Sequence, residues 1–228
     1  MASRVRVACA ALACAAAFVA TVARAAGAAA PADCAAPSPG AFVERFVPAD
    51  CERCWSGDAR AAPPRDALVV DWIVPAGADA PLAAAASGEA ARRAGRLAAG
   101  VTTTRRTRLD AAGPALRIVD GPAWSGYIAL RLVVSRGGAW RPGLRGFAAL
   151  VEHVPAGNDG SAIERQLVRA VAGPLRLEEL REAASVEHVR AVSVPEGSRV
   201  DRLSAVAWVE TAEGRVVAAA AAPPAACR

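Results

Sequence analysis

Two cysteines separated by two residues are the clearest candidates for chemistry in this chain of 228 residues. Thiol–disulfide exchange needs one thiolate that attacks and a second cysteine that resolves the mixed disulfide. The Cys51-x-x-Cys54 spacing supplies both when the pair stands at the start of a helix, where a thiolate is stabilised. The pattern predicts exchange with protein thiols or disulfides, Cys51 attacking and Cys54 resolving, without a cofactor.

The same pair permits two other interpretations. Cys51–Cys54 can be a structural disulfide in a redox-inert binding or envelope-associated module. A zinc site with Cys34 and Cys227 is the third, but the chain lacks the usual second C-x-x-C. We expect no metal and instead a Cys34–Cys227 disulfide. A cross-link closing so long a loop contributes on the order of 5 kcal/mol in the entropic account.

Few other residues suggest a site. His153 and His188 are the two histidines, and each stands in a strand-like segment, which favours an ordinary strand residue over a ligand. The Gly-Asn-Asp-Gly run at 157–160 lacks the carboxylates of a calcium loop and predicts a turn. Trp55 is the tryptophan that adjoins the cysteine pair.

The first 25 residues have the pattern of a secretory signal peptide. Arg4 and Arg6 precede an apolar run, and Ala23-Arg24-Ala25 offers a cleavage site. The run is short for a membrane span, so we expect no transmembrane segment and a periplasmic or secreted protein. Lipid attachment at Cys14 is the alternative. Of 27 basic residues three lie in this segment; the remaining 24 stand against 22 acidic ones, which argues against a nucleic-acid partner.

The elements that must position the cysteines follow from the apolar pattern. Residues 26–40 are rich in Ala, Pro and Ser, which predicts a flexible arm. Strands are predicted at 41–47, 67–74 and 115–119, with a helix over 81–99. After residue 124 the pattern changes to strands separated by turns, with one short helix at 175–184. The later strands are expected at 127–135, 147–154, 166–171, 188–194, 203–211 and 215–220.

This order resembles a family of secreted, thioredoxin-like bacterial proteins of unknown function. The matching pieces are the strand ending at Phe46 with the cysteine pair after it, Val70-Asp71-Trp72, the Gly113–Gly121 strand with Pro114, and a final hairpin over 203–219. Trp55-Ser56 replaces the Pro-Pro of the family. The resemblance implies an α/β thioredoxin-like domain at 41–124, followed by an antiparallel β-sandwich-like module at 125–228. It also implies that Pro114 is cis and faces Cys51 and Cys54 as a third site residue.

Overall fold

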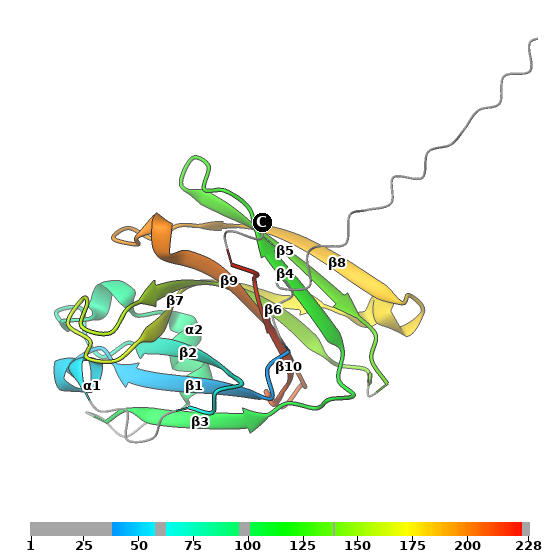
Figure 1. The fold of residues 1–228 in the computed structure, drawn as a ribbon, viewed down its shortest axis with the longest axis horizontal. Helices are drawn as coiled ribbons and strands as arrows, with labels where there is room; N and C mark the ends of the chain where they lie inside the picture. Colours follow the sequence, from blue (N-terminus) through cyan, green and yellow to red (C-terminus); the bar gives the residue numbers. More distant parts are fainter. Residues whose placement is uncertain (1–37, 58–62, 96–100, 139, 225–228) are drawn as a thin grey trace, which may run out of the picture. The chain divides into compact units, whose positions relative to one another are not determined.

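The computed structural model describes residues 38–57, 63–95, 101–138 and 140–224. This part of the chain forms ten strands and two short α-helices (Figure 1). The helices are α1 (Glu52–Ser56) and α2 (Gly88–Ala94). The strands are β1 (Ala41–Pro48), β2 (Ala67–Val74), β3 (Thr103–Arg108), β4 (Ala115–Asp120), β5 (Tyr127–Ser135), β6 (Arg145–Val154), β7 (Arg165–Arg176), β8 (Ser185–Ser193), β9 (Leu203–Glu210) and β10 (Val216–Ala221).

Seven of the strands make one mixed sheet in the order β10-β9-β6-β7-β2-β1-β3. Its parallel pairs are β1 with β2 and β2 with β7; the other neighbours run antiparallel. The remaining strands form an antiparallel sheet in the order β4-β5-β8. The larger sheet therefore takes strands from both sides of residue 124.

The predicted fold class, an α/β thioredoxin-like domain followed by a sandwich-like module, is wrong. Strand is by far the commonest regular structure among the described residues, and their two α-helices span only five and seven residues. In place of the helix expected over 81–99, a 3₁₀ turn at Ala83–Ala85 ends at Ala86, whose backbone is extended. Helix α2 then begins after its N-cap Ser87 and ends at Gly95, where φ is 64°. Without long helices to cover the faces of a sheet, one face of this sheet is buried against a second sheet instead.

Two further elements differ from the sequence expectation. Strand β7 continues to Arg176, so a 3₁₀ turn at Glu178–Arg181 replaces the helix expected over 175–184. Strand β3 was not expected, because Thr-Thr-Arg-Arg-Thr-Arg has no apolar alternation. It pairs with β1 alone as the outer strand of the sheet, where charged side chains reach solvent and discourage edge-to-edge association.

Three groups of buried side chains hold these layers together. The first lies between the two sheets and includes Leu130, Leu132 and Leu150. The second lies on the opposite face of the larger sheet, where α2 packs, and contains Trp72 and Trp208 with ring centroids 6.0 Å apart. The third lies at the end of the sheet that carries α1, and its members are Val47, Ala49, Trp55, Ile73, Val154 and Leu167. This third group positions the cysteine pair.

Candidate functional site: a braced disulfide beside a cleft

The Cys51–Cys54 disulfide stands at the carboxyl end of β1, where the chain turns into α1. Its two Cα atoms are 5.1 Å apart, which confirms the predicted disulfide. Cys51 is the N-cap of α1, and its Sγ accepts a hydrogen bond from the backbone N–H of Cys54 at 3.3 Å. Cys51 is buried and Cys54 is half-buried. The cysteine expected to attack is therefore the less accessible of the two.

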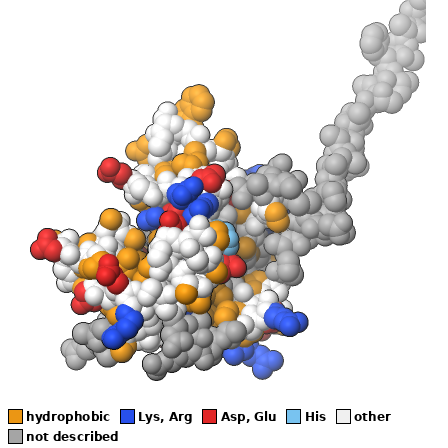
Figure 2. Space-filling view, turned by 60° about the vertical axis from the view of Figure 1, so that its left-hand side comes forward, with side chains coloured by type: hydrophobic (Ala, Val, Ile, Leu, Met, Phe, Trp, Pro, Cys, Tyr) orange, Lys and Arg blue, Asp and Glu red, His pale blue; other side chains and the backbone are white. Residues whose placement is uncertain are grey.

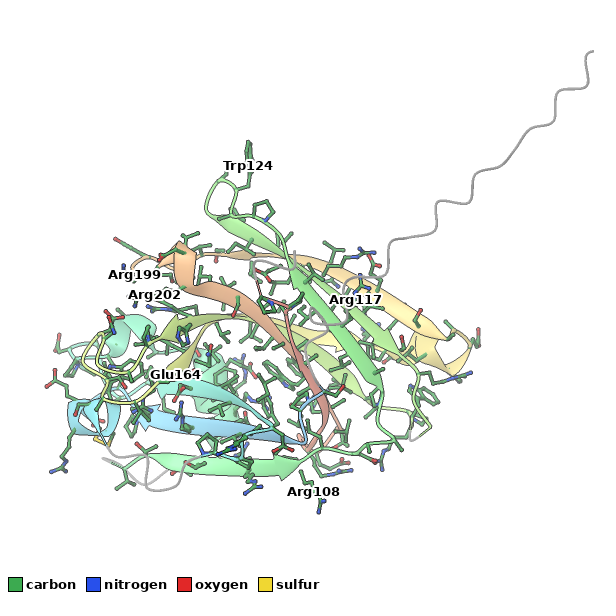
Figure 3. All side chains as sticks on the ribbon, viewed as in Figure 1. Arg108, Arg117, Trp124, Glu164, Arg199 and Arg202 are labelled. Carbon is green, nitrogen blue, oxygen red and sulfur yellow. A yellow bond between two sulfur atoms is a disulfide. The ribbon has the colours of Figure 1, made fainter. Side chains whose placement is uncertain are left out.

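Pro114 does not lie beside the cysteines. It precedes β4, and Asp110 just before it donates its backbone N–H to the Val217 carbonyl. The chain reaches this point from Arg108, which pairs with Ala41 at the start of β1, whereas the cysteines follow the end of β1. In Figures 1 and 3 α1 and the labelled Arg108 accordingly lie at opposite ends of β1 and β3. The described cis peptide bond is Gly173–Pro174, so the expectation that a cis Pro114 faces the pair is wrong.

A buried arginine holds α1 against the sheet. Arg165, at the start of β7, donates from Nη2 to the carbonyls of Cys54 at 3.0 Å and Trp55 at 2.7 Å. Its Nη1 donates to Asp71 Oδ1 at 3.1 Å, and its Nε to Ser161 Oγ at 3.1 Å. Arg165 thus links the carbonyls of Cys54 and Trp55 to Asp71 in the middle of β2. We refer to this linked group as the brace.

Asp71 is the anion at the centre of this brace. Its side chain is fully buried in β2, and Oδ2 accepts from Arg45 Nη2 at 2.6 Å and from the backbone N–H of Gln166 at 2.8 Å. Burial lowers the pKa of the Arg165 guanidinium below its ordinary value, and the Asp71 carboxylate offsets that effect only in part. Asp71 is thereby the partner that makes a buried cation tolerable at this position.

The brace also fixes the ring of Trp55. The Arg165 guanidinium lies 4.9 Å from the centre of this ring, and Trp55 Nε1 donates to the Asp159 carbonyl at 2.7 Å. Ser56 accepts a hydrogen bond from Ala162, so the loop between β6 and β7 is joined to α1 at both Trp55 and Ser56. The ring is held on one face by a cation and at its edge by a carbonyl.

Trp55 forms one wall of a cleft of about 240 Å³. Its apolar lining comes from β2, β6, β7 and the segment before α2, and its polar lining is Glu152, Arg169, Asp159 and Arg199. Figure 2 turns this end of the molecule forward and shows basic and acidic side chains gathered among apolar ones. Neither cysteine is among the residues that line the cleft, but Trp55, which lines it, follows Cys54 directly in α1. The apolar lining residues are Trp55, Ile73, Leu82, Ala85, Val154 and Leu167.

A second buried ion cluster lies on the other face of the sheet. Arg93 of α2 donates to Glu44 at 2.7 Å and to Glu210 at 2.8 Å, and its guanidinium lies over the rings of Trp72 and Trp208. Burial lowers the pKa of the Arg93 guanidinium, but the two glutamates outweigh burial and the net direction is upward. This cluster fastens α2 to strands β1 and β9 and lies away from the cleft.

The remaining sequence candidates do not form a site. His153 contacts Gln166 in the larger sheet, whereas His188 contacts the Arg176 carbonyl from the smaller one. Among the described residues no cluster of three or more His, Cys, Asp or Glu is arranged to hold a metal ion. Within the same ranges, no helix is long and apolar enough to cross a membrane. The predicted Cys34–Cys227 disulfide and the residues of the predicted signal peptide lie outside the described residues.

Sequence reasoning missed Asp71, Arg165 and Arg199. Asp71 carried a signal, since it is the single charge in an otherwise apolar strand, and a charge that is buried needs a partner. No local pattern marks Arg165 as that partner, because 94 positions separate the two residues. Arg199 stands in an ordinary turn-rich segment and becomes notable only through its neighbours in space.

Comparison with known proteins supports the fold and nothing finer. No protein-family profile matches the sequence, and no curated protein matches it. Among solved structures, HBP35 of Porphyromonas gingivalis is similar, with a TM-score of 0.52 and 10% sequence identity. The similarity covers 84% of this chain and 78% of that chain. At this identity it indicates a shared arrangement of elements, not a shared activity.

Proposed function

We propose that this protein is a non-catalytic binding module of an oxidising, extracytoplasmic compartment, and that Cys51–Cys54 is a structural disulfide. The observation that carries the proposal is the position of Arg165, which bonds the carbonyls of Cys54 and Trp55 and is itself held by Asp71. The disulfide is one part of a brace that fixes the Trp55 wall of the cleft.

Two features argue against disulfide exchange at this pair. Exchange through Cys51, the cysteine expected to attack, requires that its sulfur can be approached, yet Cys51 is 8% exposed and the more accessible of the two is Cys54. The proline expected to shape a substrate site lies at the other end of β1. A structural role accounts for both facts, because a disulfide that braces a wall needs neither access nor a facing proline.

The cysteine chemistry and the signal-like pattern of residues 1–25 support the proposed compartment. A disulfide such as Cys51–Cys54 persists in secreted, periplasmic or cell-surface proteins and is rare in the cytosol. The signal-like pattern of residues 1–25 predicts export to such a compartment.

The proposal is tested by measuring the rate at which dithiothreitol reduces insulin in the presence of the purified protein or of a Cys51→Ala/Cys54→Ala variant. We expect both proteins to leave this rate at its background value. Urea unfolding should show a loss of about 2 kcal/mol for the variant, which is what the chain-entropy account gives for so short a disulfide loop. Insulin reduction by the unaltered protein well above that of the variant would contradict the proposal and favour exchange.

A further inference from the structure

The cleft beside Trp55 has the size of a small apolar group. At roughly 30 Å³ for each water-sized volume, about 240 Å³ accommodates roughly eight non-hydrogen atoms. Ile73, Val154 and Leu167 belong to the apolar cluster at this end of the sheet and line the cleft together with Leu82. This lining suits an aliphatic or small aromatic group, whose burial there removes apolar surface from water.

Two acidic residues and two arginines line the cleft, and Arg202, which pairs with Asp159 from outside the lining, leaves one cation in excess around it. Glu152 is 2% exposed, and its Oε2 accepts from Arg169 Nε at 2.6 Å. Asp159 is paired in the same way, since its Oδ2 accepts from Arg202 at 2.8 Å. Both acidic groups are thus neutralised by an arginine.

Arg199 is the surplus cation. Its backbone N–H donates to Glu152 Oε1 at 3.3 Å, which anchors this residue at the polar side of the cleft. Arg199 lines the cleft and is exposed, and its guanidinium has no partner among the described residues. Figure 3 shows Arg199 beside Arg202 on the segment that leads into β9. A guanidinium with free donors next to an apolar cleft is suited to bind a carboxylate.

We infer that this cleft binds small amphipathic carboxylates, with the apolar group against Trp55 and Leu167 and the carboxylate on Arg199. The inference rests on the proposed binding function and specifies its ligand class. Two sources share this chemistry: a medium-chain carboxylate, and the carboxyl end of an apolar amino acid or peptide.

Isothermal titration of the purified full chain with matched probes tests the inference. Octanoate is compared with octan-1-ol, and N-acetyl-leucine with N-acetyl-leucinamide, so that each pair differs at the charged group. We expect the carboxylate of at least one pair to bind about tenfold more tightly than its neutral counterpart. The pair that shows the larger preference identifies the source.

Three variants locate the interaction. Arg199→Gln should weaken carboxylate binding about tenfold, to the affinity of the neutral probe. Arg106→Gln is the matched control, because Arg106 is an exposed arginine on β3 that does not line the cleft, and binding should be unchanged. Ala85→Leu places a larger side chain in the cleft and should remove binding of both probes of the pair.

The outcomes separate this inference from the function on which it rests. Equal affinity for charged and neutral probes, or an Arg199→Gln variant that binds as the unaltered protein does, would overturn the carboxylate assignment. The absence of binding by all four probes at millimolar concentration would overturn it as well. The proposed function fails by a different result, insulin reduction that depends on Cys51 and Cys54.

Discussion

Replacing Asp71 by asparagine tests whether the buried ion cluster holds α1 in place. The side chain keeps its shape but loses its charge, and two buried cations, Arg45 and Arg165, then lack their anion. The carboxylate is fully buried and accepts three hydrogen bonds, two of them from guanidinium groups. Removing one partner of a buried ion pair costs ~3–5 kcal/mol, and we expect a loss of this size in the free energy of unfolding.

Urea unfolding followed by circular dichroism measures this loss, and thermal unfolding checks it. For a chain of this length the midpoint temperature should fall by roughly 6–20 °C. Asp79→Asn is the matched control, because Asp79 is exposed and has no hydrogen bond or ion pair among the described residues; its effect should stay within about 0.5 kcal/mol. A loss below about 1 kcal/mol for Asp71→Asn would refute the claim that this carboxylate holds the two arginines.

A double-mutant cycle separates the Asp71–Arg165 contact from general damage to the core. Arg165→Met removes the cation and leaves an apolar side chain of similar length, so Asp71 keeps Arg45 as its partner. If the two groups act together, the double variant loses less stability than the two single losses added. Additive losses would mean that the 3.1 Å contact contributes nothing of its own.

Two further predictions concern charges away from the cleft. Arg93→Gln removes the buried cation that Glu44 and Glu210 share and leaves them the more exposed Arg105 at 3.6 Å and Arg145 at 3.2 Å. Urea unfolding should therefore show a loss of ~3 kcal/mol, and a loss under about 1 kcal/mol would contradict the role given to this cluster. Hydrogen bonds from Arg131 lower the pKa of Glu187, so the small stability that this pair adds is present above the ordinary glutamate pKa and disappears as the pH falls through the lowered value. In an NMR titration Arg131→Gln should move the pKa of Glu187 upward, and an unchanged pKa would show that the contact is absent in solution.

Local sequence patterns predicted the strands well, because a buried strand leaves its mark in consecutive residues. The apolar run at 67–74 is strand β2, and the segments at 41–47 and 127–135 are strands β1 and β5. The helix predictions were weaker. Alanine favours helix wherever it occurs, but the extended backbone at Ala86 and the turn at Gly95 limited the described part of the 81–99 segment to a 3₁₀ turn at Ala83–Ala85 and the short helix α2.

The cysteine pair was also visible in the sequence, but its surroundings were not. The C-x-x-C spacing is enough to predict a disulfide, since two intervening residues allow the sulfurs to meet. Whether a proline faces the pair depends on where β4 lies, and β4 pairs with β5 in the other sheet. The resemblance to thioredoxin-like proteins placed Pro114 by analogy, and strand pairing put it at the far end of β1.

By itself, then, the sequence determined most of the strands, though not β3, and showed that Cys51 and Cys54 can join and that Asp71 is a charge in an apolar strand. Only the tertiary structure decided that β7 runs beside β2, which brings Arg165 to that charge and to the carbonyl of Trp55. The physical reason is the distance along the chain over which each interaction acts. Strand periodicity and cysteine spacing act between near neighbours in the chain, whereas pairing between distant strands depends on which faces can be buried together.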